Sequence, residues 1–361
     1  MDNPKKIPEN YHPKQPIVLD LAGAAKAQSR VLSVKRVGFI SSTDDDRSPE
    51  SFPLPACMAS VMETLGEDYG EITIYAHNRS YTKRLANHAF LGASGMAFGL
   101  LWSNKHDFTS LDLTLISPLS EVVRRICAFA GYTYELFSSG TYDKNTVYRK
   151  IIQSIDNGMP VITFGLFGHT ECALIAGYEN LGQHLVGWSH FQSEKNVETA
   201  DNGMFRISDW DEEWTSIVIL HDKVGRSLSY SDALAHGLTI MQKTEASGYL
   251  AGYAAFDHWI SAVSAEHVDP SLFSYHDAVL FNYAELRAWG SDFLRDAGAS
   301  KAADLFMQIH DLCWKANAIT PNAETFAIYE NRCRTADILK EMVHLDHMAE
   351  EEIKCYLGKQ N

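Results

Sequence analysis

Apolar residues recur along this chain with two different periods, and the period changes near residue 226. Between residues 160 and 221, short apolar runs alternate with polar turns, which predicts strands joined by short connections. The runs are PVITFGLFG, ECALIAGYE, HLVGWSHF, FRISDW and TSIVILH, and ENLGQ has the composition of a hairpin turn. Beyond residue 226 the spacing becomes three and four, as at Tyr249, Tyr253, Phe256, Ile260 and Val263, which predicts amphipathic helices.

Helical patterns also precede these strands. The segment SPLSEVVRRICAFAG, 117–131, predicts a helix that starts at Pro118 and stops at Gly131. Residues 143–158 predict a second helix, and residues 79–103 predict a helix, a glycine-rich turn and an apolar segment.

The order of these elements indicates the fold class. Helices followed by an antiparallel sheet are typical of an α+β fold and not of a doubly wound parallel sheet. The segment KRVGFISST, 35–43, has strand chemistry and follows a polar, proline-punctuated start. We therefore expect an N-terminal arm over residues 1–35, an α+β domain over 36–224 and an all-helical domain over 225–361.

Net charge and hydropathy limit the kinds of partner that we expect for this chain. The formal net charge is −15, from 31 basic and 46 acidic residues, which argues against nucleic acid and anionic membrane surfaces because both need a basic face. No run of 18 apolar residues occurs, and the first 20 residues lack the apolar core of a signal peptide. These features predict a cytoplasmic protein.

Familiar chemical motifs are missing from the sequence. It contains no Walker loop, G-x-G-x-x-G, G-x-S-x-G or H-E-x-x-H pattern, so we expect neither a cofactor nor a metal. The six cysteines form no C-x-x-C pair, and most are expected to be buried small apolar residues. They are Cys57, Cys127, Cys172, Cys313, Cys333 and Cys355.

Cys57 has a distinctive predicted context. It follows two prolines in the segment ESFPLPACMASVMETLG, and Pro55 is expected to occupy the first helical position, where its missing N–H costs nothing. The positive end of a helix stabilises a thiolate in the first turn, which favours a nucleophile. A backbone N–H at the same helix end could donate into an oxyanion hole. Of the six cysteines, only Cys57 is expected to have this context, so we take it as the candidate nucleophile.

Several features together resemble a known family. A cysteine on a helix that opens the domain, G-x-P-V entering a strand, a strand ending in G-Y, a short turn and another strand resemble the papain-like fold in its C39-type form. The segment FLGASGMAFG with that hairpin is similar to the butirosin-biosynthesis acyltransferase family named for its H protein. The segment GYLAGYAAFDHW resembles a helical domain often attached to that family. The resemblance covers roughly residues 36–330, and it implies a papain-like domain followed by a helical one.

The expected base and orienting group depart from this pattern. C39-type proteins carry a histidine where this chain has Glu171, and an aspartate near the end of the next strand, where this chain has GWSH. In one interpretation, His169 or His190 is the base and Glu171 orients it, since His190 shares a strand face with Trp188. In the other, the site has lost its base. Each of these side chains also has an ordinary structural alternative, at a strand end or at the solvent-facing edge.

The resemblance also suggests where a substrate would lie. The glycine-rich segment 92–99 has close helix packing as its simpler explanation, and lining an acyl pocket as its functional one. The candidate binding residues are Ser94, Gly95, Phe98, Trp102, Trp188 and Ser189.

These observations converge on one expected function and two alternatives. The resemblance implies cysteine-dependent acyl transfer in specialised metabolism, from a small-molecule or carrier-protein-bound donor to an amine, through acyl-Cys57. A cysteine amidase or peptidase-type hydrolase is one alternative, and a non-catalytic ligand-binding protein on a degraded papain-like fold is the other. The helical domain would cover the cleft or form a homodimer face.

Overall fold

The computed structural model describes residues 25–37, 52–69, 72–76, 79–83, 86–166, 172–190, 192, 197–208 and 214–360. Its contacts divide the chain into two compact units, formed by residues 1–38 with 135–220 and by residues 39–134 with 221–361. We call the first the sheet unit and the second the helical unit. The helices before residue 134 thus belong with those after residue 221, whereas the expected domain boundary lay near residue 224.

The sheet unit is built on an eight-stranded sheet within the described residues, and every strand pair with a defined register is antiparallel. Its order is β5-β11-β6-β7-β8-β10-β9, with β1 also paired to β7. The strands are β1 (Arg30–Val31), β5 (Tyr132–Ser138), β6 (Val161–Phe164), β7 (Cys172–Glu179), β8 (His184–Ser189), β9 (Glu198–Thr199), β10 (Phe205–Ile207) and β11 (Ser216–Lys223). The division between units falls within β5 and β11. The antiparallel sheet, together with the separate set of helices, confirms the α+β class.

The described part of the expected N-terminal arm belongs to this sheet. Arg30 and Val31 pair with β7, and the Leu32 N–H donates to the Ala176 carbonyl at 2.8 Å. Gly177 makes the close approach feasible, because a Cβ atom there would lie 2.4 Å from the Arg30 carbonyl oxygen. Residues 1–24 lie outside the described residues.

Helix α4 (Lys144–Asp156) packs with the strands around the core of the sheet unit. The Asp143 side chain caps it by accepting from the Thr146 N–H, as expected for an acidic N-cap. The apolar stripe of α4, including Val147, Ile151 and Ile155, is fully buried.

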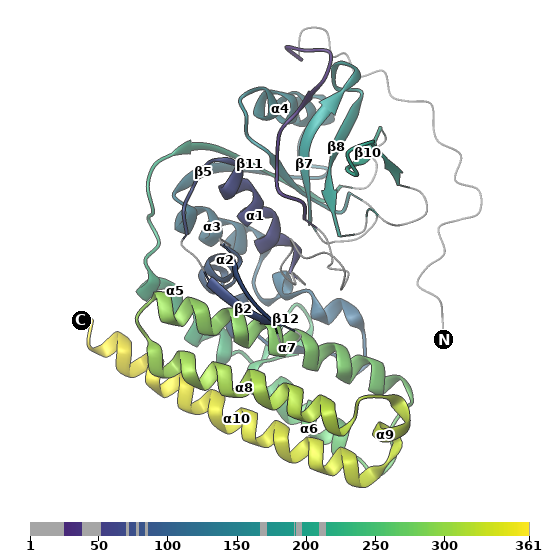
Figure 1. Ribbon diagram of the computed structural model, residues 1–361, viewed down its shortest axis with the longest axis vertical. Helices are drawn as coiled ribbons and strands as arrows, with labels where there is room; N and C mark the ends of the chain where they lie inside the picture. The colour runs from purple at the N-terminus through teal and green to yellow at the C-terminus, as the bar shows by residue number, and fades with distance from the viewer. Residues whose placement is uncertain are drawn as a thin grey trace. The chain divides into compact units, whose positions relative to one another are not determined.

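The helical unit contains the remaining helices. They are α1 (Pro53–Thr64), α2 (Asn87–Ser94), α3 (Leu119–Ala130), α5 (Tyr230–Met241), α6 (Gly252–Ser264), α7 (Ser271–Asp296), α8 (Ser300–Ile319), α9 (Ala323–Ala327) and α10 (Tyr329–Gly358). Short 3-10 turns are η1 (Met96–Phe98), η2 (Phe108–Leu111) and η3 (Leu113–Ile116), with η4 (Asn180–Gly182) in the sheet unit. The long helix α8 packs against both α7 and α10, and the three run side by side (Figure 1).

Two predictions for this unit are wrong. Residues 79–83 form strand β3 (Arg79–Lys83), paired with β2 (Ile72–Ala76), and are not helical. Strands also occur after residue 226, because β12 (Glu245–Ala246) and β13 (Tyr249–Ala251) form a three-stranded sheet with β4 (Leu101–Trp102). Strands of two or three residues are too short to produce a recognisable period.

Glycines and phenylalanines interlock at the centre of the helical unit. Three glycines each lie against one aromatic ring, and ideal Cβ atoms at those glycines would lie 2.1 to 2.8 Å from ring carbons. The pairs are Gly92 with Phe293, Gly237 with Phe98, and Gly290 with Phe306. These pairs support the simpler explanation of the glycine-rich segment 92–99, that small residues allow helices to pack closely.

A buried ion pair joins three elements of the same unit. Arg287 on α7 donates from Nε and Nη2 to the two carboxylate oxygens of Asp346 on α10, at 3.1 and 3.0 Å, and both side chains are 2% exposed. Its Nη1 donates to the Ala97 carbonyl of η1 at 2.7 Å, and the Tyr283 hydroxyl bonds to both charged partners. Burial alone lowers the pKa of Arg287, but the Asp346 carboxylate raises it above its ordinary value. Arg287 therefore stays charged and holds η1 against α7 and α10.

We expect Gly92→Ala to destabilise the protein by about 1–3 kcal/mol, because the added methyl group forces the Phe293 ring out of its place. Gly358→Ala is the matched control, since Gly358 is also helical but nothing lies within 4 Å of its ideal Cβ. Thermal unfolding of both variants checks the prediction. Equal melting temperatures would contradict it.

We expect Asp346→Asn and Arg287→Met each to lower the free energy of unfolding by about 3–5 kcal/mol, because each leaves a buried charge without its partner. Asp337→Asn removes a carboxylate of the same helix that pairs with Lys340 at the surface, and it should cost less than about 1 kcal/mol. Urea unfolding measures all three. The prediction fails if Asp346→Asn costs no more than Asp337→Asn.

Candidate functional site

Cys57 lies on α1, in the helical unit, and its side chain is fully buried. The helix begins at Pro53, two residues before the expected start, so Cys57 occupies the fifth helical position. Pro53 and Pro55 stand at the first and third positions, where an N–H has no partner within the helix. The predicted start at Pro55 was wrong because both prolines fit the first turn equally well. Cys57 thus lies just beyond the turn in which the helix dipole acts most strongly.

The other cysteines show whether this helix position is specific to Cys57. Cys333 is also the fifth residue of its helix, α10, and it is half-buried, so it shares the helix position of Cys57, although no proline opens α10. Burial raises the pKa of Cys127 to about 12 and raises that of Cys313 further. Cys355 is exposed, and Cys172 is buried at the start of β7. Helix position alone therefore does not distinguish Cys57 from Cys333.

The predicted substrate residues Ser94 and Gly95 end helix α2, which packs against α1. The Ser94 hydroxyl donates to the Leu91 carbonyl at 3.0 Å and accepts from the Met96 N–H at 3.3 Å. Gly95 has a left-handed backbone with φ of 90°, and a Cβ atom there would lie 2.8 Å from the His236 ring. Both residues thus turn the chain from α2 into η1.

Phe98 and Trp102 lie in aromatic clusters of the helical unit, each about 1% exposed. The Phe98 ring centroid is 5.7 Å from that of Phe306. Trp102 stacks on Trp259 at 6.0 Å and lies 4.8 Å from the Tyr275 ring. Their surroundings account for their burial, and their predicted contact with an acyl group stays a prediction.

In the sheet unit, Trp188 and Ser189 end β8 and His190 follows it directly; their exposed fractions are 7%, 2% and 5%. The Ser189 N–H donates to the Gln192 side chain at 3.2 Å, and Gln192 donates to the Gly203 carbonyl at 3.0 Å. The end of the strand is therefore tied to the loop before β10. The other two predicted catalytic residues, His169 and Glu171, lie outside the described residues.

Trp188 has two further features. Its indole N–H is buried and has no hydrogen-bond partner among the described residues. The Arg36 guanidinium, also in the sheet unit, lies over the indole at 5.3 Å from the ring centroid. Sequence reasoning identified Trp188 but missed Arg36, because nothing in the sequence links two residues so far apart.

His236 on α5 is a second residue that sequence reasoning missed. Its imidazole lies against Gly95, and burial, aided by the Arg125 charge, lowers its pKa from 6.5 to about 4. Arg125 donates to the Ala93 carbonyl at 3.0 Å and to the Asp232 carbonyl at 3.2 Å. These two side chains fix the end of α2.

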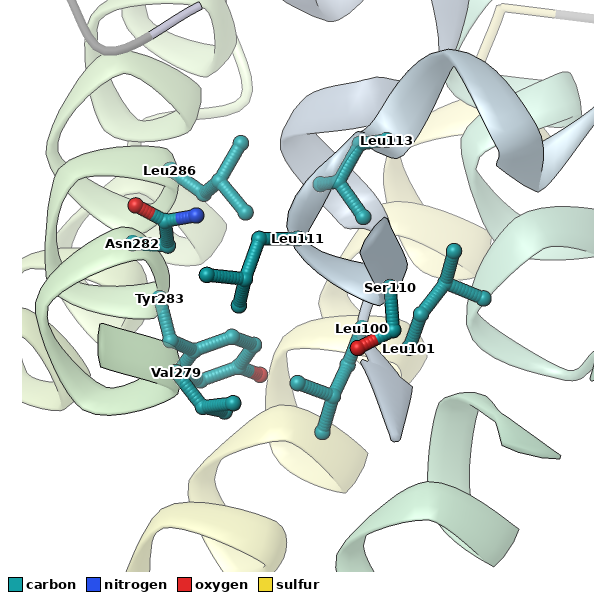
Figure 2. Close-up of a pocket in the computed structure, with 9 residues that line it drawn as sticks. All are labelled: Leu100, Leu101, Ser110, Leu111, Leu113, Val279, Asn282, Tyr283 and Leu286. Atoms are coloured by element: carbon teal, nitrogen blue, oxygen red, sulfur yellow. The ribbon is translucent and has the colours of Figure 1, made fainter. Parts of the chain in front are cut away.

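A small hollow lies between α7 and the segment from β4 to η3 (Figure 2). Its lining is mostly aliphatic, and the Ser110 and Tyr283 hydroxyls on its walls are already hydrogen-bonded within the protein. The lining residues are Leu100, Leu101, Ser110, Leu111, Leu113, Val279, Asn282, Tyr283 and Leu286. The enclosed volume is about 10 Å³, roughly what one water molecule needs, so this hollow is too small for a substrate.

Among the described residues, no three His, Cys, Asp or Glu side chains gather in a way that would hold a metal ion. None of the helices in the described chain is both long and apolar enough to cross a membrane.

Comparisons with known proteins give no relative. No protein-family model matches the chain, and no curated protein matches it. The function is therefore inferred from the residues themselves.

The lowered pKa of His236 predicts acid sensitivity. Its folded pKa of about 4 lies below the ordinary 6.5, so the unfolded chain binds this proton more readily between those values, and stability falls as pH drops below 6.5. We expect His236→Gln to reduce this fall, by at most about 1.4 kcal/mol per pH unit. Some of the fall should remain in that variant, because burial also lowers the pKa of His276, to about 3. Urea unfolding at pH 7, 6 and 5 tests it, and identical pH dependence in both proteins would contradict it.

Proposed function

We propose that this chain is a cysteine-dependent acyltransferase in which Cys57 carries the acyl group. The observation that supports this most directly is the entry to α1, because two prolines stand in the turn before Cys57, whereas no proline opens the helix that carries Cys333. The α+β organisation is also compatible with the papain-like resemblance, because the candidate nucleophile lies on a helix and the candidate base follows a strand of an antiparallel sheet.

The proposed acyl transfer would proceed in two steps. The Cys57 thiolate attacks the carbonyl of a thioester or amide donor, and the donor's thiol or amine leaves with a proton as the acyl-cysteine forms. An amine then attacks the acyl-cysteine, and the Cys57 thiolate leaves while the amine loses a proton to the base. Water in place of the amine would give hydrolysis, which is the amidase or peptidase alternative.

The proposal assigns the base to His190 or His169, with Glu171 as the orienting group. Imidazole is suited to this role because its ordinary pKa lies near neutrality. The acceptor would be an amine, which the acidic chain attracts. The donor would be a small molecule or a carrier-bound acyl group, in a biosynthetic pathway of the cytoplasm.

One observation favours the non-catalytic alternative. Cys57 is fully buried, and buried structural cysteines are ordinarily inert. In that case the chain would bind a ligand on a papain-like scaffold without turning it over.

The pH dependence of thiol labelling tests the proposal. We expect iodoacetamide to modify Cys57 with a rate midpoint well below pH 8.5, the value of a free thiol, because a paired base keeps the thiolate populated. The midpoint is the criterion, since restricted access slows every rate but leaves the midpoint unchanged when opening is rapid. Mass spectrometry across pH 5–9 identifies the modified cysteine.

Cys333 is the internal control, because it has the same helix position and is more accessible. If Cys57 and Cys333 share a midpoint near 8.5, or if Cys57 reacts only in urea, the non-catalytic alternative is correct. If the midpoint is low, incubation with an acyl thioester of N-acetylcysteamine should add the acyl mass to Cys57, and Cys57→Ser should abolish that addition.

A further inference from the structure

A buried hydrogen-bond donor near the end of β8 lacks a partner among the described residues, which points to a ligand. Trp188 is 7% exposed, and its indole N–H has no partner among the described residues. Buried donors are nearly always paired, and each exception calls for an explanation. The indole can only donate, so whatever completes this site must supply an acceptor.

A cation lies beside this donor. The Arg36 guanidinium is 5.3 Å from the centroid of the Trp188 ring, and both residues belong to the sheet unit. Guanidinium is also a pure donor, and its planar fork fits carboxylate and phosphate groups. The indole nitrogen is part of the ring that Arg36 covers, so the cation lies close to the unpartnered donor.

We propose that the end of β8 binds an anionic group of a ligand, a carboxylate or a phosphate, between the Trp188 indole N–H and the Arg36 guanidinium. Two hydrogen bonds fix the end of β8 beside Trp188, from the Ser189 N–H to the Gln192 side chain and from Gln192 to the Gly203 carbonyl. The ring of Trp188 lies under Gly203, at ordinary contact distance from its ideal Cβ.

This site limits the expected substrates to molecules that carry a carboxylate or a phosphate group. In so far as it concerns catalysis, the inference rests on the proposed function, because His190 follows Trp188 by two residues and is one of the two candidate bases. An anion held here would place a charged group of the donor or acceptor near that imidazole. The binding itself needs neither Cys57 nor any chemistry.

Indole NMR tests the proposal on the full chain. The chain has seven tryptophans, so protein labelled with ¹⁵N at the indole should give seven N–H signals, and Trp188→Phe identifies one of them. The Cys57→Ser protein is titrated with sodium phosphate, and separately with sodium acetate, at constant ionic strength set with chloride. We expect the Trp188 signal to shift downfield and saturate with one of the two anions. Saturation by phosphate identifies a phosphorylated ligand, and saturation by acetate identifies a carboxylate.

Variants separate a built site from a general salt effect. Arg36→Gln should weaken the saturating anion at least about tenfold, and Arg36→Lys should weaken it less, because lysine keeps the charge but not the fork. Trp214→Phe, which removes another buried indole of the sheet unit, should leave the affinity unchanged. The proposal is overturned if the Trp188 signal does not move, if all indole signals drift together without saturating, or if Arg36→Gln binds as tightly as the parent. Because the parent here lacks Cys57, anion binding and acyl transfer can fail independently.

Discussion

The ion pair between Arg287 and Asp346 is the constraint on which the helical unit depends. A charged pair 2% exposed is stable only when every donor finds a partner, and Arg287 meets this by also reaching the Ala97 carbonyl. The positions of α7, α10 and η1 are therefore coupled, because none can shift without leaving a buried charge or carbonyl unpaired. The phenylalanine rings that fill the spaces beside three glycines then leave little freedom for α2, against which α1 packs.

Much of this architecture follows from sequence because its signals are local. The apolar runs between polar turns predicted the bounds of β7 and β8 almost to the residue. Helix α3 ends where expected, at Gly131, which has a left-handed backbone. The failures have local causes too. Two prolines in one turn left the start of α1 ambiguous, and β12, β13 and β4 are too short for a period to be visible. The ion pair itself was not predictable, since Arg287 and Asp346 each look like ordinary polar positions on amphipathic helices.

In the candidate site too, local features could be predicted from the sequence and contacts between distant segments could not. Trp188 and His190 are both buried, but β8 ends at Ser189 and His190 follows it, so the predicted shared strand face stays a prediction. Arg36 over the indole and His236 against Gly95 come from distant segments, and only tertiary packing brings them there. The glycine-rich segment shows the opposite error, because its composition suggests a ligand loop while its glycines fit phenylalanine rings.

The comparison between Cys57 and Cys333 determines where any reactivity of Cys57 must originate. Both thiols stand at the fifth position of a helix, beyond the turn in which the dipole acts most strongly. The effect of the helix dipole is therefore nearly the same for both thiols, and Cys333 is the more exposed of the two. Greater reactivity of Cys57 than of Cys333 would have to come from a group outside α1. Whether this chain is an enzyme therefore depends on whether a base reaches the buried sulfur of Cys57. It does not depend on the helix that carries this residue.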